Sequence, residues 1–68
     1  MNSFAKRIRE LRIEHKLTQK ELAHNLNVLA RTISYWEQGR QECDFTTLIK
    51  IAKYFNVSID FLLGLSDY

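Results

Sequence analysis

The stretch that decides the fold is residues 17–39, which read LTQKELAHNLNVLARTISYWEQG. Thr18 and Glu21 have the spacing of a capping box, in which each side chain bonds the free backbone N–H of the other residue at a helix start. Leu17 before the cap and Leu22 after it are placed to form the accompanying hydrophobic staple. These signals predict a short helix that begins directly after Thr18.

A turn and a second helix follow this first helix. Asn27 is one of the few residue types other than glycine that tolerate the left-handed backbone that ends many helices. The turn is therefore predicted near Asn27 and Val28. The second helix is predicted over about residues 29–38, because Gly39 occupies the position of a helix stop.

The second helix has one apolar face and one outward face. Ile33 and Trp36 are three residues apart and so share the face that we expect to be buried. Trp36 is therefore interpreted as a core residue rather than as a platform for base stacking. The residues left pointing outward are Ala30, Arg31, Ser34 and Tyr35.

Residues along nearly the whole chain agree with one known sequence pattern. In the quoted stretch they are Leu17, Thr18, Gln19, Glu21, Leu22, Ala23, Val28, Thr32, Ile33, Ser34, Trp36, Glu37 and Gly39. Beyond it they are Thr47, Leu48, Ala52, Val57, Leu62, Leu63 and Gly64. The chain thus resembles the Cro and phage-repressor (XRE-type) family of small transcriptional regulators, with its helix-turn-helix unit at about residues 18–38.

Three further helices are predicted outside this unit. The first covers about residues 3–15, the second begins after Asp44, and the third begins after Ser58 and stops at Gly64. The apolar residues predicted to face the core from these helices are Phe4, Ile8, Leu11, Leu48, Ile51, Ala52 and Phe55. Together with the resemblance, this predicts an all-α, compact five-helix bundle of the phage-repressor DNA-binding type, as one domain over residues 1–68.

Composition excludes several classes of protein. A chain of 68 residues that is 46% hydrophobic is suited to one small folded domain and is not disordered. No apolar run approaches the roughly 20 residues that a membrane-spanning helix needs, and basic residues interrupt any secretory signal near the N-terminus. The single cysteine, Cys43, cannot form an internal disulfide and suits a reducing compartment. We therefore expect a cytoplasmic protein that does not enter membranes.

Charge is unevenly distributed along the chain. Residues 1–40 hold eight Lys or Arg and four acidic residues, for a net +4, whereas residues 41–68 hold two and four, for a net −2. Because duplex DNA carries one negative charge per about 1.7 Å of its axis, such an asymmetry would turn the basic half toward DNA. The alternative is a solvated charged face on the helix predicted over about residues 3–15.

The resemblance implies which outward residues meet DNA. The resemblance implies that base edges are contacted by Ala30, Arg31, Ser34 and Tyr35. It implies that phosphates are contacted by Gln19, Lys20, Thr32, Gln38 and Arg40. Arg31 can bond both O6 and N7 of a guanine, a pairing worth about 1–3 kcal/mol of discrimination, or it can hold a phosphate instead. Both roles remain open for Arg31 at this stage.

The resemblance also implies a structural ion pair and exposes one departure from the family pattern. Arg12 and Glu37 correspond to a basic and acidic pair that links the helix of about residues 3–15 to the end of the helix of about residues 29–38. Leu29 stands at the predicted N-cap of the helix of about residues 29–38, where the family usually has Ser or Thr and where a leucine cannot accept N–H bonds. Cys43 replaces a proline that is common in the following loop.

Two copies of such a domain, spaced by one turn of DNA or about 34 Å, match a nearly palindromic operator, so a homodimer is the expected binding form. The candidate dimer residues lie in the acidic half, where they are more apolar than an exposed surface requires: Tyr54, Phe61, Leu65 and Tyr68. The same aromatic residues could instead close the small core.

The leading interpretation is a sequence-specific binder of double-stranded DNA that acts as a transcriptional repressor, without cofactor or metal. The alternative is an antitoxin or other protein-binding module that uses the same fold with a toxin or another protein partner. Catalysis is disfavoured because no Ser, His and Asp set and no phosphate-binding glycine loop can be assembled from the sequence. His15 and His24 lack partners at metal-ligand spacing.

Overall fold

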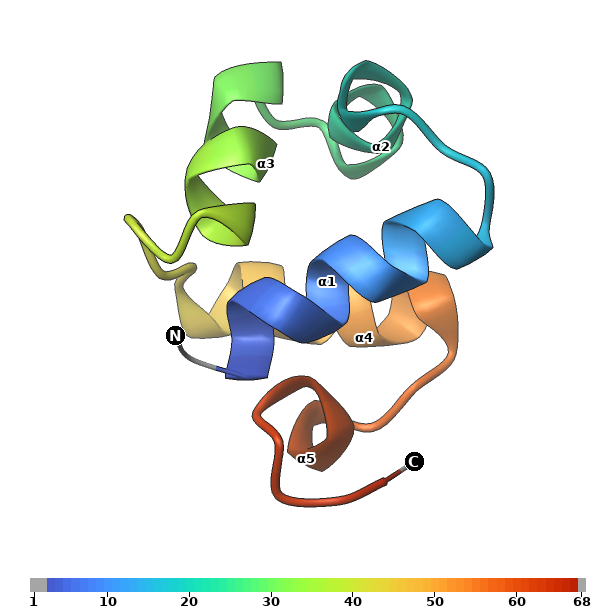
Figure 1. Ribbon diagram of the computed structural model, residues 1–68, viewed down its shortest axis with the longest axis vertical. Coiled ribbons are helices and arrows are strands. Elements are labelled where there is room, and N and C mark those ends of the chain that lie inside the picture. The colour runs from blue at the N-terminus through green and yellow to red at the C-terminus, as the bar shows by residue number, and fades with distance from the viewer. Residues whose placement is uncertain (1–2, 68) are drawn as a thin grey trace.

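A computed structural model describes residues 3–67 of the chain. Within that range it has five helices and no strand: α1 (Ser3–Glu14), α2 (Gln19–Leu26), α3 (Ala30–Glu37), α4 (Phe45–Phe55) and α5 (Ile59–Leu62). In Figure 1, α1 crosses the middle of the bundle, with α2 and α3 on one side of it and α5 on the other, while α4 overlaps α1 in this view and packs against both α2 and α5. None of these helices is long and apolar enough to span a membrane. The prediction of an all-α five-helix fold is confirmed.

The predicted helix starts are confirmed by their hydrogen bonds. Thr18 Oγ1 accepts from the Glu21 backbone N–H at 3.0 Å, and Glu21 Oε1 accepts from the Thr18 N–H at 2.8 Å. At α4, Asp44 Oδ1 accepts from the Thr47 N–H at 2.9 Å, and this hydrogen bonding to Thr47 holds the pKa of Asp44 below its ordinary value. Ser58 caps α5 in the same way. Short polar side chains at these positions thus set where three helices begin.

The helix ends depend on residues that accept a left-handed backbone. Asn27 closes α2 with a φ of 59° and Asn56 closes α4 with a φ of 56°. Gly39 and Gly64 follow α3 and α5 with φ values of 73° and 80°. A Cβ atom at Gly64 would collide with the side chain of Ser3, so glycine is required there for space as well as for backbone conformation.

The observed bounds differ from the predicted ones by one or two residues. The first helix ends at Glu14 rather than at His15. The third is one residue shorter at each end, because Leu29 and Gln38 have the backbone geometry of caps. The last helix ends at Leu62, with Leu63 as its C-cap before Gly64. The last residue of a helix carries little sequence signal, so differences of one or two residues are usual.

All five helices contribute to one apolar core. Its fully buried large side chains are Ile8, Leu22, Leu26, Ile33, Trp36, Ile51 and Leu62. Trp36 is 2% exposed and packs edge-on against Phe4, with the ring centroids 6.0 Å apart. Its indole N–H is buried without an acceptor among the described residues, so packing rather than hydrogen bonding fixes its position. The interior location predicted for Trp36 is confirmed.

Cys43 lies half-buried in the connection between α3 and α4. Burial raises the pKa of its thiol to about 11, so the reactive thiolate is scarce at neutral pH. We expect iodoacetamide to alkylate Cys43 in the folded protein about 100-fold more slowly than in the denatured chain at the same pH. Mass spectrometry of timed reactions measures both rates, and equal rates would show that the folded thiol is accessible and ionised.

Candidate nucleic-acid interface

The third helix is anchored by one face and leaves the other on the surface. Ile33 and Trp36 fix α3 to the core, and α3 lies at the edge of the bundle beside α2 (Figure 1). On its outer side the predicted base-contact residues differ in exposure: Ala30 and Arg31 are exposed, whereas Ser34 and Tyr35 are half-buried. These four residues lie outside the buried core, as a helix that enters a DNA groove requires.

The polar residues at the end of α3 are linked to one another. Gln38 Nε2 donates to Ser34 Oγ at 2.7 Å, and Arg40 Nη1 lies 3.4 Å from Gln38 Oε1. The Arg40 guanidinium also stacks on the Tyr35 ring, 4.8 Å from its centroid. Two predicted base-contact residues and two predicted phosphate-contact residues therefore form one continuous surface, with a positive charge at its edge.

The start of α3 lacks a side-chain cap. Leu29 has the extended backbone of an N-cap, but no side chain accepts from the first N–H groups of α3, and Leu29 itself is 59% exposed. Val28 beside it packs against the core. The undercapped start predicted from the sequence is therefore present, and it leaves backbone donors and the positive end of the helix dipole available to an anion.

Leu29→Ser is expected to raise the free energy of unfolding by about 1 kcal/mol, because a serine hydroxyl can accept one of these N–H groups. Urea unfolding of the two proteins measures the difference. Leu29→Ala is the matched control, since it removes the exposed leucine without supplying an acceptor. A serine variant no more stable than the alanine variant would show that the first turn gains nothing from a cap.

Glu37 joins the first three helices. Its Oε2 accepts from Arg12 Nε at 2.6 Å, and its Oε1 accepts from Arg12 Nη2 at 3.0 Å and from Gln19 Nε2 at 3.1 Å. Arg12 Nη1 donates in addition to the Leu17 carbonyl at 2.9 Å. The side chains of Arg12 and Glu37 are only 14% and 5% exposed, and the hydrogen bond to Glu37 raises the pKa of Arg12. The ion pair implied by the resemblance is thus a largely buried junction.

The contact of Gln19 with Glu37 was missed by the sequence reasoning. The sequence indicated only that Gln19 begins a helix and suits a phosphate there. One of the two N–H groups of the Gln19 side-chain amide donates to Glu37, which leaves the other N–H group for a phosphate. The two residues are 18 positions apart, so only the packing of α2 against α3 brings them together. The other predicted phosphate contacts near it are Lys20, which is exposed, and Thr32, which is half-buried.

The predicted dimer residues are unequally available. Tyr54 is 40% exposed, and its hydroxyl accepts a hydrogen bond from Asn25 Nδ2 at 2.8 Å. Phe61 is half-buried and packs against the core. Leu65 is 75% exposed, and Tyr68 lies outside the described residues. Of the three described residues, Leu65 is therefore the most accessible to a partner.

The two histidines, His15 and His24, lie on the surface. Both are exposed, and His15 Nδ1 lies 2.9 Å from the Leu11 carbonyl while its ring packs edge-on against Phe55. Over residues 3–67, no group of three or more His, Cys, Asp or Glu side chains is arranged to hold a metal ion.

A family model described as helix-turn-helix matches residues 8–62, which is most of the chain and includes α2, the turn and α3. The chain belongs to the XRE-type helix-turn-helix family of transcriptional regulators.

This helix-turn-helix protein is similar to regulators of known name. It is 40% identical over 62 residues to the HTH-type transcriptional regulator ImmR of Bacillus subtilis (strain 168), covering 91% of this chain and 49% of ImmR. It is 36% identical over 64 residues to the cryptic phage CTXphi transcriptional repressor RstR of Vibrio cholerae, covering 94% of this chain and 58% of RstR.

A solved structure agrees with these relatives. The crystal structure of a transcriptional regulator from Listeria innocua superposes with a TM-score of 0.85 at 41% identity, covering 90% of this chain and 57% of that one. The helix-turn-helix chain thus spans about half the length of these three relatives. What those proteins share with it is the DNA-binding helix-turn-helix domain.

Proposed function

We propose that this protein binds specific sites on double-stranded DNA by inserting α3 into the major groove and represses transcription by occupying those sites. The observation that carries the proposal is that α3 has one buried apolar face and one face on the surface. Its Ile33 and Trp36 are buried, while its opposite side presents Ala30, Arg31, Ser34 and Tyr35. An α-helix of about 10–12 Å diameter fits a groove about 12 Å wide, so this outer side is the part that reaches base edges.

The surroundings of α3 favour phosphate contact on both sides of the groove. The uncapped amides at the start of α3 can bind one phosphate, and Arg40 at its end carries a charge for another. Lys20 and the remaining N–H of the Gln19 amide extend this set at the start of α2. Contacts at these positions would fix the helix in the groove, while Arg31 reads a base or holds a further phosphate.

The proposal includes a homodimer that acts in the cytoplasm, without a cofactor and without a catalytic step. A single α3 reads only a few base pairs, so two copies on a nearly palindromic operator give a longer site. The RstR relative is by name a repressor, which supports repression as the outcome of binding.

Selection of bound duplexes from a random pool tests the proposal. We expect enrichment of one inverted repeat whose half-sites are about 10 base pairs apart, centre to centre. The selected site, placed over a promoter, is expected to lower transcription when the protein is expressed. No enrichment at low salt would overturn DNA binding by this chain, and increased transcription would overturn repression alone.

A further inference from the structure

Three polar side chains at the end of α3 form one hydrogen-bonded chain. Arg40 Nη1 donates to Gln38 Oε1 at 3.4 Å, and Gln38 Nε2 donates to Ser34 Oγ at 2.7 Å. The ring of Tyr35 supports the far end of this chain, because the Arg40 guanidinium stacks on it at 4.8 Å from the centroid. The residues expected to contact bases and phosphates are therefore coupled to one another within the protein.

The direction of this chain follows from the chemistry of its members. A guanidinium has N–H donors and no acceptor, so the Gln38 atom that bonds Arg40 must be the amide oxygen. The amide nitrogen of Gln38 then faces Ser34 and can only donate, so the Ser34 hydroxyl oxygen must accept. Each hydrogen bond in the chain thus runs from Arg40 toward Ser34.

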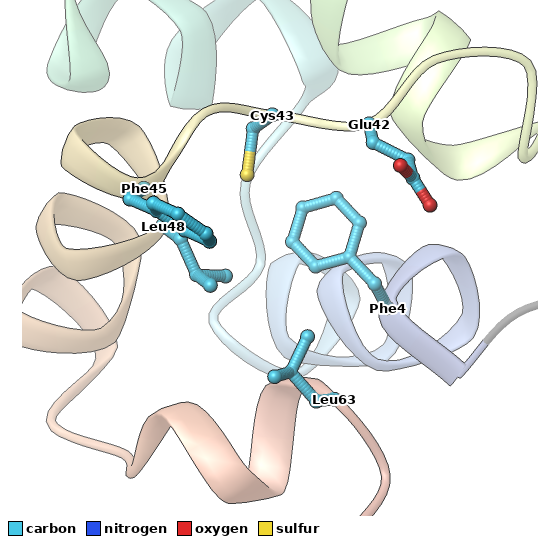
Figure 2. Close-up of a pocket in the computed structure, with 6 residues that line it drawn as sticks. All are labelled: Phe4, Glu42, Cys43, Phe45, Leu48 and Leu63. Carbon is cyan, nitrogen blue, oxygen red and sulfur yellow. The ribbon is translucent and has the colours of Figure 1, made fainter.

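The positive charge of Arg40 is available to this chain. Glu42 is the acidic residue nearest to Arg40 along the sequence, and Figure 2 shows it at the edge of an apolar hollow that it lines with Phe4. The carboxylate of Glu37 is bonded to Arg12 instead. Within residues 3–67 neither carboxylate pairs with Arg40, so the charge acts on Gln38 and on whatever approaches from solvent.

The accepted hydrogen bond changes what the Ser34 hydroxyl offers to a further partner. Gln38 occupies one acceptor site of the hydroxyl oxygen, and the O–H is left to donate. Hydrogen bonds in a chain polarise one another, so the cation at the far end makes the last O–H a stronger donor. The same charge repels the donor groups of an approaching partner. Ser34 is therefore biased toward partners that accept a hydrogen bond.

We propose that Gln38 and Arg40 set the base preference of Ser34 by holding its hydroxyl as a donor. This inference rests on the proposed function, in which Ser34 faces the major groove. There guanine, adenine and thymine present acceptors, whereas cytosine presents its N4 amino group as a donor. Ser34 therefore selects against cytosine at the base that it contacts. Gln38 and Arg40 are positioning residues for this contact, and their remaining N–H groups are still available to phosphates.

A gel-shift series over operator variants tests the proposal. The position contacted by Ser34 is the one that loses its base preference in Ser34→Ala, and each base is placed there in turn. Wild-type protein is expected to bind the cytosine operator about 5- to 10-fold more weakly than the best of the others. Because a preference is a ratio of affinities for one protein, any general gain or loss of affinity cancels.

Gln38→Glu is the decisive variant. A carboxylate only accepts, so the Ser34 hydroxyl must donate to it and turns its acceptor sites toward the groove. The preference is then expected to reverse, with the cytosine operator bound about 5-fold more tightly than the others. Gln38 is exposed at the C-cap of α3, so the variant should fold, as circular dichroism can verify.

Gln38→Met is the matched control for this reversal. It keeps a side chain of similar length but forms no hydrogen bond with Ser34, so the hydroxyl turns freely and can donate or accept. The preference against cytosine is therefore expected to fall below about 2-fold without reversing. A methionine variant that reversed the preference as glutamate does would show that the direction of the hydrogen bond is not the cause.

The hydrogen bond between Gln38 and Ser34 can be measured without DNA. In NMR spectra of the free protein, Ser34→Ala is expected to shift one side-chain amide proton of Gln38 upfield, because the variant removes its acceptor. Ser34→Thr keeps a hydroxyl and should leave that signal close to its wild-type position. Gln38 signals that do not change in Ser34→Ala would overturn the inference at its first step.

Two further results would overturn the inference in a protein that binds DNA. One is a Ser34→Ala variant that keeps every base preference of the wild type, which would assign the hydroxyl to the Ala30 carbonyl one turn earlier in α3. The other is a Gln38→Glu variant that still disfavours cytosine. A wild-type protein that binds no duplex would instead overturn the proposed function and the inference together, so the two failures are distinguishable.

Discussion

Glu37→Ala is expected to lower the free energy of unfolding by a large share of its total. Glu37 accepts three hydrogen bonds, two from Arg12 and one from Gln19, and its side chain is 5% exposed. Removing one member of a buried ion pair costs about 3–5 kcal/mol, because the other charge stays in a poorly solvated position. A domain of 68 residues has a total stability of about 3–10 kcal/mol, so the loss is a large share of it.

The stranded charge cannot escape by losing its proton. Arg12 is charged at every accessible pH, and its hydrogen bond to Glu37 raises its pKa further in the wild type. After the substitution it retains the Leu17 carbonyl as an acceptor, which is a neutral group. Urea unfolding monitored by circular dichroism measures the effect as a fall in the midpoint.

The double variant Arg12→Met with Glu37→Met is the control for this prediction. It removes both charges and keeps side chains of similar length, so it should be within about 2 kcal/mol of the wild type and more stable than Glu37→Ala. If Glu37→Ala costs less than about 1 kcal/mol, the pair behaves as an exposed salt bridge, and its burial has no energetic consequence.

Arg31→Ala is expected to weaken binding to the selected operator by about 10- to 100-fold, corresponding to about 1–3 kcal/mol. The reason is that the exposed Arg31 side chain lies near the start of α3, where a guanidinium can reach O6 and N7 of a guanine. A quantitative gel-shift series over operators with each base pair changed in turn measures both affinity and preference. One position of the operator should lose its base preference.

Lys20→Ala is the matched comparison for Arg31→Ala, because it also removes one exposed basic side chain. As a phosphate contact, Lys20 should contribute equally to all sequences, and its removal should lower the salt dependence by about one unit of slope. If Arg31→Ala weakens every operator variant equally, Arg31 is a phosphate contact rather than a reader of sequence.

The helix boundaries could be predicted from the sequence because they depend on local chemistry. Thr18, Glu21 and Asp44 act within one turn of their own helix, and Asn27 ends α2 through its own backbone conformation. The buried face of α3 was equally predictable, since the spacing of Ile33 and Trp36 alone places them together. These features need no knowledge of how the helices pack.

Side-chain partners across helices could be predicted only in part. The resemblance indicated that Arg12 and Glu37 meet, but not that Gln19 joins them, because 18 residues separate Gln19 from Glu37. The stacking of Arg40 on Tyr35 likewise depends on the path of the chain after Gly39. Nor could the sequence predict that Ser34 and Tyr35, which were expected to point outward, are each half-buried.

At the uncapped start of α3, the order of the first helical turn depends on whether a phosphate is bound there. Because Leu29 offers no acceptor, the amides of the first turn of α3 have no side-chain partner in the protein alone, and helix ends of this kind fray. A phosphate seated there would complete the turn in place of a serine or threonine. The segment that carries the proposed base contacts would then exchange its amide hydrogens more slowly on the duplex than in free solution, so the operator itself completes the helix that recognises it.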